Sequence, residues 1–241
     1  KELEIQKGAL IALDVETLEV LAMVSLPAYN LNDTTPRFKS ETVKWINENG
    51  AWLNRPIQGT YPPGSPYKLV TTIAGLQHGA IDADTMYTCN GYHKVGRRLF
   101  PCHNRSGHGD VKVKDAIRVS CNVFYYNVGL EIGIDKLSAT AMHLGLHNRS
   151  SIDLPNENRR MIVPTKAWKK DTQGFGWTPG DTANASIGQG YTLNTPIQLA
   201  LLAASIARNE VVSGPSILKR TPEQVAAIPR GPDLGLNAEQ Y

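Results

Sequence analysis

The feature that most constrains the fold is a serine–lysine pair, Ser65 and Lys68, placed directly after the segment Tyr61–Gly64. Two prolines and a glycine in that segment interrupt any upstream helix or strand. Pro66 suits the first turn of a helix, because its missing N–H needs no partner there. Apolar residues at helical spacing then continue to Gly79. We therefore predict a helix from Ser65 to Gly79 that carries the serine and the lysine on one face.

This pairing is typical of nucleophilic catalysis. A serine hydroxyl is a poor nucleophile unless a nearby base takes its proton, and a buried lysine with a lowered pKa can be that base. The start of a helix also offers N–H groups to a developing oxyanion. The four-residue pattern is weak by itself. Ser216-Ile217-Leu218-Lys219 also matches it without a helix start, and Ser65 alone could simply cap a helix.

A second polar motif, Ser120-Cys121-Asn122, lies between two segments with helical spacing, Lys114–Val119 and Val123–Gly133. At such a junction the hydroxyl can pass a proton to a leaving group. The amide can bind a substrate carbonyl or the lysine. The alternative is a pair of capping residues for the helix that follows. Together with Ser65 and Lys68, the motif favours a serine acyl-transfer site.

The rest of the chain predicts a mixed α+β fold in which helices outnumber strands. Two strand-like segments, Gly8–Asp14 and Leu18–Ser25, predict an antiparallel hairpin. Further helices are predicted at Glu41–Glu48, Asp135–Leu144 and Ile197–Ala207, the last capped by Thr195 with Pro196 at its first position. Residues 85–111 show no lasting periodicity and are predicted to form an irregular insertion. No element is assigned to residues 210–241.

Composition excludes several classes of protein. The net charge is only +3 and the Lys and Arg residues are scattered, which argues against a nucleic-acid partner. No apolar run is long enough to cross a bilayer, and the N-terminus carries no signal-like segment. The sequence starts abruptly at Lys1, as expected of a piece of a longer protein. With 241 residues the chain can bury one large core or two small ones.

The cysteines form a candidate metal site. The chain has three cysteines, Cys89, Cys102 and Cys121, and His108 lies between the last two. An odd number of cysteines excludes a framework made of disulfides alone. Three cysteines and one histidine are a complete ligand set for structural zinc, and the insertion has too few apolar residues to hold itself together. Two alternatives remain, a Cys89–Cys102 disulfide with Cys121 buried, and three reduced thiols with a surface histidine. His93 and His103 are interpreted as loop histidines.

The two polar motifs together resemble the signature of penicillin-binding proteins and serine β-lactamases. Their surroundings are similar to the penicillin-binding protein 2 family, the class B D,D-transpeptidases of cell elongation, from about residue 8 to residue 209. The similar segments are Gly8–Ser25, Leu53–Gly64, Gly107–Gly109, Gly133–Asp135, Gly180–Thr182, Ile187–Tyr191 and Thr195–Gln198. The resemblance implies an antiparallel sheet flanked by helices, with the active site between the sheet and a helical subdomain.

The resemblance also implies a reaction. Ser65 attacks the penultimate D-Ala carbonyl of a peptidoglycan stem peptide, and the terminal D-Ala leaves. An amine of a neighbouring stem peptide then resolves the acyl-enzyme into a cross-link, and β-lactams trap the serine. In this scheme Lys68 is the base, and Ser120 and Asn122 form the second motif. Implied partners are a membrane glycan polymerase and a periplasmic elongation scaffold. The implied location is the periplasmic side of the bacterial inner membrane, with the anchor outside this chain.

Two features depart from the family pattern. The usual Ser-Thr-x-Lys appears as Ser65-Pro66-Tyr67-Lys68, and Lys-Thr-Gly, which the family carries on a later strand, does not occur in residues 1–241. We therefore expect an incomplete transpeptidase domain that lacks its C-terminal strands and is poorly active as it stands. A β-lactamase or β-lactam sensor of the same fold, and a non-catalytic scaffold domain, remain as alternatives.

The resemblance bears on the cysteines as well. The resemblance implies zinc here, because some homologues of the family hold it at the same four positions, with carboxylates replacing some of the cysteines. A periplasmic setting, by contrast, favours a disulfide. We favour zinc, held by Cys89, Cys102, His108 and Cys121. Because Cys121 stands between Ser120 and Asn122, a metal there would hold the second motif in place.

Overall fold

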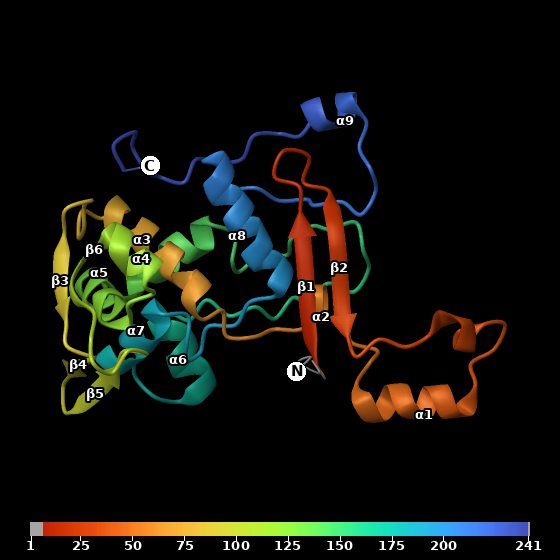
Figure 1. Cartoon of the computed structure of the whole chain (residues 1–241), viewed down its shortest axis with the longest axis horizontal. Coiled ribbons are helices and arrows are strands. Elements are labelled where there is room, and N and C mark those ends of the chain that lie inside the picture. Colours follow the sequence, from red (N-terminus) through yellow and green to blue (C-terminus); the bar gives the residue numbers. More distant parts are fainter. Residues whose placement is uncertain (1–6, 241) are drawn as a thin grey trace.

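The structure is a computed structural model that describes residues 7–240; residues 1–6 and 241 of the predicted domain lie outside the described part. Helices and strands are mixed, with helices in the majority, which confirms the α+β prediction. A body of helices lies at one end of the molecule and a β-hairpin beside it, with helix α8 (Pro196–Arg208) between the two (Figure 1). The chain thus brings segments from both halves of the sequence to the same helical body.

The hairpin consists of strands β1 (Gly8–Leu13) and β2 (Val20–Leu26), as predicted. They pair antiparallel from Gly8 opposite Leu26 to Leu13 opposite Val20, with a bulge after Ala12. The inner face of the hairpin packs against a small apolar cluster that includes Ile197 of α8. In the described part of the chain this sheet has two strands, extended only by a single bridge between Glu19 and Ser216.

The helical body is built around the long helix α5 (Asn122–His143), against which α3 (Lys68–Gln77) and α7 (Pro179–Ser186) pack. The two helices predicted on either side of residue 134 are both present within α5, separated by a kink at Gly133, where φ is 75° and the backbone is not helical. Apolar residues repeat along α3 and α5 at helical spacing, so their buried faces form two large core clusters. The predicted helix at Ser65 begins as a 3-10 turn, Ser65–Tyr67, before α3 starts.

The prediction of an irregular insertion at residues 85–111 is wrong. The segment forms two antiparallel pairs of strands, β3 (Met86–Cys89) with β6 (Gly109–Lys112), and β4 (Tyr92–Val95) with β5 (Arg98–Pro101). Each strand has four residues, too few for an alternating pattern to stand out in the sequence. The β3–β6 pair is also non-local, so no turn signal connects its two strands.

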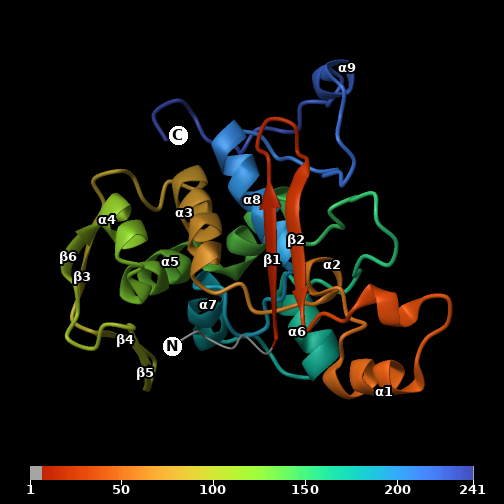
Figure 2. The same cartoon turned by 45° about the vertical axis from the view of Figure 1, so that its right-hand side comes forward.

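The remaining elements surround these units. They are the 3-10 turn η1 (Leu31–Thr34) and the helices α1 (Ser40–Asn49), α2 (Arg55–Gln58), α4 (Val113–Arg118), α6 (Lys166–Gln173) and α9 (Pro222–Ala226). Helix α1, which confirms the prediction at Glu41–Glu48, lies on an arm that projects from the body (Figure 2). Residues 210–240 hold little regular structure apart from α9. Among the described residues no helix has the length and apolar character needed to span a bilayer.

Candidate active site

The serine of the first motif lies at the mouth of a small cavity. Ser65 is exposed and opens the turn that leads into α3, and Gly64 before it has a φ of 63°. The backbone N–H of Gly64 donates to the carbonyl of Gly188, 2.9 Å away. The Pro-Pro-Gly segment therefore ends in a turn that is held against the loop after α7, with Ser65 exposed at the cavity.

Lys68 lies one turn further on, and its ammonium group is buried. Its side chain is only 4% exposed, and burial lowers the pKa of Lys68 from 10.5 to about 8. Its Nζ donates to the Ser120 carbonyl at 2.7 Å, to Ser120 Oγ at 2.9 Å and to Asn122 Oδ1 at 2.6 Å. Burial favours the neutral amine, which is the form that can accept a proton.

Ser120 connects the lysine to the nucleophile. Its hydroxyl lies 2.9 Å from Ser65 Oγ and 2.9 Å from Lys68 Nζ. The residue has a φ of 52° in the turn between α4 and α5, a conformation rare for a serine. This turn directs both its carbonyl and its hydroxyl towards Lys68. A proton can therefore pass from Ser65 to Lys68 along two hydrogen bonds.

Asn122 completes the group at the first position of α5. Its amide oxygen accepts from Lys68, while its amide nitrogen donates to the carbonyl of Pro101 at the end of β5, 3.3 Å away. The structure thus brings together all four catalytic residues predicted from the sequence, from two segments more than fifty residues apart.

The cavity at Ser65 has a volume of about 370 Å³. Its lining residues are Gly64, Ser65, His103, Ser120, Asn122, Ile187 and Gln189. Sequence reasoning missed the lining role of His103, which was interpreted as a loop histidine, and of Gln189. The two glycines that flank Gln189 indicate a tight loop at this point, and both adopt positive φ.

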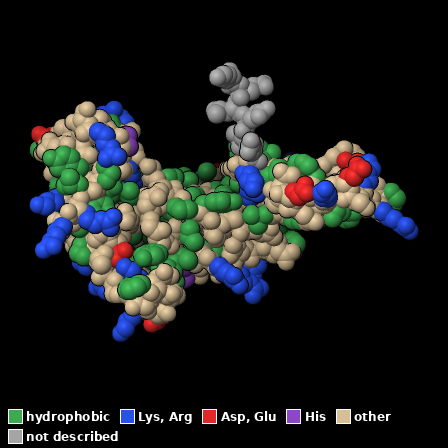
Figure 3. Space-filling view, turned by 90° about the horizontal axis from the view of Figure 1, so that it is seen from below, with side chains coloured by type: hydrophobic (Ala, Val, Ile, Leu, Met, Phe, Trp, Pro, Cys, Tyr) green, Lys and Arg blue, Asp and Glu red, His purple; other side chains and the backbone are tan. Residues whose placement is uncertain are grey.

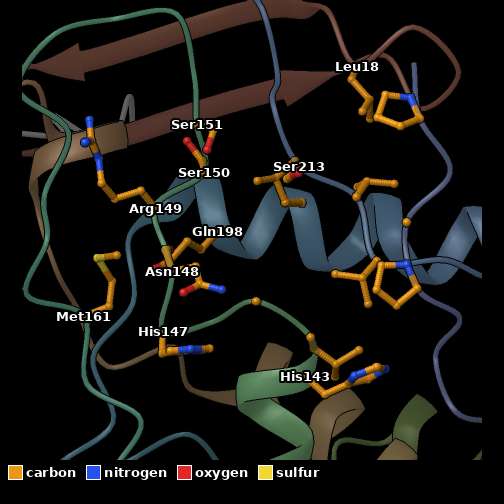
Figure 4. A pocket seen from close by; sticks show the side chains of 18 of the residues that line it. Leu18, His143, His147, Asn148, Arg149, Ser150, Ser151, Met161, Gln198 and Ser213 are labelled. Carbon is orange, nitrogen blue, oxygen red and sulfur yellow. The ribbon is translucent and has the colours of Figure 1, made fainter. Parts of the chain in front are cut away.

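Two larger cavities, each of about 890 Å³, lie away from this chemistry. One of them is bordered by Gln198 of α8 and by His147 and Asn148 (Figure 4). The second Ser-x-x-Lys match does not form a comparable site. The Ser216 hydroxyl donates to Asp153 at 2.6 Å, and its neighbour Lys219 is exposed.

The four predicted metal ligands converge on one point. One ligand atom from each of Cys89, Cys102, His108 and Cys121 lies within 4.8 Å of the others, and the two distances from His108 Nδ1 to the Sγ atoms of Cys89 and Cys102 are both 3.6 Å. Zn–S bonds of about 2.3 Å and Zn–N bonds of about 2.0 Å in a tetrahedron place ligand atoms about 3.5–3.8 Å apart. All three cysteines are buried and free. The donor types are those of a Cys₃His zinc site, and the two His108–cysteine distances lie in the range expected for a tetrahedron.

Comparisons with known proteins identify the family of this chain. Residues 8–231 match the model of the penicillin binding protein transpeptidase domain. The peptidoglycan D,D-transpeptidase MrdA of Acinetobacter baumannii is 33% identical over 220 residues, which is 90% of this chain and 33% of the relative. The chain thus spans about a third of the length of that curated relative.

Solved structures show the same relationship. Penicillin-binding protein PBP2 of Helicobacter pylori superposes with a TM-score of 0.87 at 32% identity, over 98% of this chain and 44% of that one. The same protein in complex with MreC gives a TM-score of 0.85 at 33% identity, over 98% of this chain and 43% of that one. A chain of a peptidoglycan synthase complex, described for the structural coordination of polymerization and crosslinking, superposes with a TM-score of 0.76 at 33% identity. The match covers 91% of this chain and 41% of that one. This chain belongs to the penicillin-binding protein transpeptidase domain family.

Proposed function

We propose that this chain is the acyl-transfer core of a peptidoglycan D,D-transpeptidase that cross-links stem peptides during cell elongation and is a target of β-lactams. The observation that carries the proposal is the hydrogen-bonded chain from Ser65 Oγ through Ser120 Oγ to Lys68 Nζ at the mouth of a cavity. The family supports the substrate, a peptide ending in D-Ala-D-Ala.

Acylation uses these residues in order. Ser65 Oγ attacks the penultimate D-Ala carbonyl, and its proton moves to Ser120 Oγ while Ser120 passes its own proton to neutral Lys68. The C–N bond to the terminal D-Ala then breaks, and Lys68 returns the proton through Ser120 Oγ to the leaving amine. An acyl-enzyme ester remains on Ser65. The amine of a second stem peptide attacks this ester and loses a proton through Ser120 Oγ to Lys68, and that proton returns to the Ser65 oxygen as the C–O bond breaks and the cross-link forms.

Covalent labelling with a fluorescent penicillin tests the nucleophile. We expect the parent protein to be labelled and Ser65→Ala to be unlabelled, because the attacking oxygen is gone while the exposed position tolerates alanine. Ser216→Ala, in the second Ser-x-x-Lys match, is the control and should label like the parent. Labelling that persists in Ser65→Ala would refute the assignment. Rapid release of the label from the parent would instead indicate a β-lactamase.

We also propose that Cys89, Cys102, His108 and Cys121 hold a structural zinc ion. The convergence of three buried thiols and one imidazole on one point supports this, as do the two 3.6 Å distances from His108 Nδ1 to Cys89 and Cys102. A bound zinc would tie the ends of β3 and β5 to the residue between Ser120 and Asn122, and it would take no part in proton transfer. Metal analysis of the purified protein should find about one zinc per chain, and Cys121→Ser should lower it. Protein without tightly bound metal and with Cys89 and Cys102 oxidised would contradict the proposal.

We further propose that the protein works at the periplasmic face of the inner membrane, with an elongation scaffold and a membrane glycan polymerase as partners. The support is a relative solved in complex with MreC and another within a peptidoglycan synthase complex. Fractionation of cells that express the native gene with an epitope tag should place it in the inner membrane. Co-purification from that fraction should recover a glycan polymerase, and a cytosolic location would overturn the proposal.

A further inference from the structure

The strands between Asp84 and Asp110 form an unusually one-sided charged region. Residues 85–109 contain no Asp or Glu, and they carry four cationic side chains, Lys94, Arg97, Arg98 and Arg105. All four are exposed, and none of them forms an ion pair with a described residue. In this respect they differ from Lys112, which is paired with Asp84. Lys and Arg side chains also lie on this end of the molecule in the space-filling view (Figure 3).

Three of the four cations lie on the hairpin of β4 and β5, which is anchored on one face only. Its inner face carries Phe100, which is buried and packs edge-to-face on Tyr126 of α5 at 5.7 Å. The Pro101 carbonyl accepts hydrogen bonds from Asn122 Nδ2 and from Tyr126 Oη. The hairpin is therefore fixed to α5 at the catalytic end of that helix.

The outer face of the same hairpin is free. Tyr92 is 55% exposed and Leu99 is 62% exposed, and Lys94 lies directly opposite Leu99. An aromatic ring, an aliphatic side chain and a cation thus share this face, and two arginines follow at the turn. Aromatic residues and arginine are enriched where proteins bind partners.

The charged hairpin is continuous with the acylation cavity. Strand β5 ends at Pro101, Cys102 follows, and His103 then lines the cavity beside Ser65. A chain molecule with its reactive end at Ser65 can therefore extend over the hairpin. Such a molecule would meet positive charge there, because residues 85–109 contain no acidic residue to compensate it.

We propose that the hairpin β4–β5 is a docking surface for the carboxylate-bearing peptide chains of the substrate polymer, outside the acylation cavity. This inference rests on the proposed function and names a second point of contact for that substrate. Arginine binds carboxylates through two parallel N–H groups, and an unopposed cationic surface attracts a polyanion over distances near the Debye length. Tyr92 and Leu99 add apolar contact area.

Co-sedimentation with insoluble purified peptidoglycan tests this surface. Arg97→Gln/Arg98→Gln is compared with a matched control, Lys44→Gln/Lys219→Gln, which removes the same charge from the α1 arm and from the C-terminal segment. Exposed ion pairs are individually weak, about two- to threefold in binding each, so the loss of both arginines should weaken binding about 5–10-fold relative to the parent. The control should bind within about twofold of the parent.

Three further measurements define the ligand. Raising the salt from about 0.1 M to about 1 M shortens the Debye length from about 10 Å to about 3 Å. This should weaken peptidoglycan binding by the parent more than binding by the test variant. With peptidoglycan whose carboxylates are amidated, the parent and the test variant should bind equally well. Vesicles of phosphatidylcholine with phosphatidylglycerol should not bind through Arg97 and Arg98; if they do, the surface is directed at a membrane and the proposal is overturned.

The outcome stays separate from that of the proposed function. Penicillin labelling of Arg97→Gln/Arg98→Gln should stay within about twofold of the parent, because a small β-lactam reaches Ser65 without the hairpin and a surface charge changes its approach only weakly. Ser65→Ala should bind peptidoglycan like the parent. Equal binding of the test variant and the matched control would refute the docking surface, whatever the labelling shows.

Discussion

At the scale of single residues, the chemistry depends on the protonation of Lys68. The buried ammonium group loses hydration, which lowers its pKa to about 8. Only the neutral amine can accept the proton of Ser65, so the acylation rate should rise with pH and level off above about 8. The rate constant for penicillin acylation between pH 6 and pH 10 measures this.

The same shift has a consequence for stability. The lysine of the unfolded chain keeps its proton up to about 10.5, whereas the folded one releases it near 8. The unfolded state therefore binds more protons between these two values, and the free energy of unfolding should rise with pH across that window. Lys68→Met should lack both pH dependences. A rate that rises only near 10.5 would show that the lysine is not desolvated.

At the scale of elements, the loop after α7 positions the nucleophile. Gly188 has a φ of 68°, and a Cβ on it would lie 2.4 Å from the Gly64 carbonyl oxygen. Gly188→Ala should therefore push residue 64 away and displace Ser65. A shift of about 1 Å at a reacting group can slow a reaction about 10²-fold, so penicillin acylation should fall by that order.

A matched control separates this displacement from backbone strain. Gly174 at the end of α6 also has a positive φ, 75°, but a Cβ there would meet no atom within 4 Å. Gly174→Ala should cost about 1–2 kcal/mol of stability from the left-handed backbone alone and leave acylation unchanged. The acylation rate and the melting temperature are measured for both variants. Equal acylation rates in Gly188→Ala and Gly174→Ala would contradict the role given to Gly188.

Elements also differ in how well the sequence predicts them. The helix at Ser65, the β1–β2 hairpin and helix α8 were predicted because their signals are local: a proline in the first turn, two apolar runs, and a threonine cap. The strands β3 to β6 were missed. Their stability comes from pairing and from packing on α5, and four residues carry too little periodicity to show this.

At the scale of the whole molecule, the cysteine–histidine cluster joins three elements that are separated in the sequence. Cys89 ends β3, Cys102 follows β5, and Cys121 caps α5. Removal of the proposed zinc with a chelator should therefore loosen the strand pairs β3–β6 and β4–β5 together with the second catalytic motif. Zinc-finger sites bind with about 10–16 kcal/mol. Even if chelation lowers the free energy of unfolding by only about 3 kcal/mol, the melting temperature should fall by about 6–12 °C.

Melting curves and penicillin acylation rates, each with and without chelator, measure this effect. Both should fall on chelation and recover when zinc is restored. Cys89→Ser provides the comparison, since a chelator should change a protein with a broken site much less. Melting and acylation that do not respond to the chelator in the parent would rule out a stabilising metal.

The sequence by itself predicts the nucleophilic serine and its lysine base, because these two depend on residue type and short spacing. It also predicts four metal ligands, from residue type alone. Only the tertiary structure decided that Ser120 lies between Ser65 and Lys68, that His103 and Gln189 line the cavity, and that the cations of β4 and β5 face solvent beside it. The physical reason is distance along the chain. Contacts between residues fifty or more positions apart are set by how helices and hairpins pack, and no local pattern in the sequence encodes that packing.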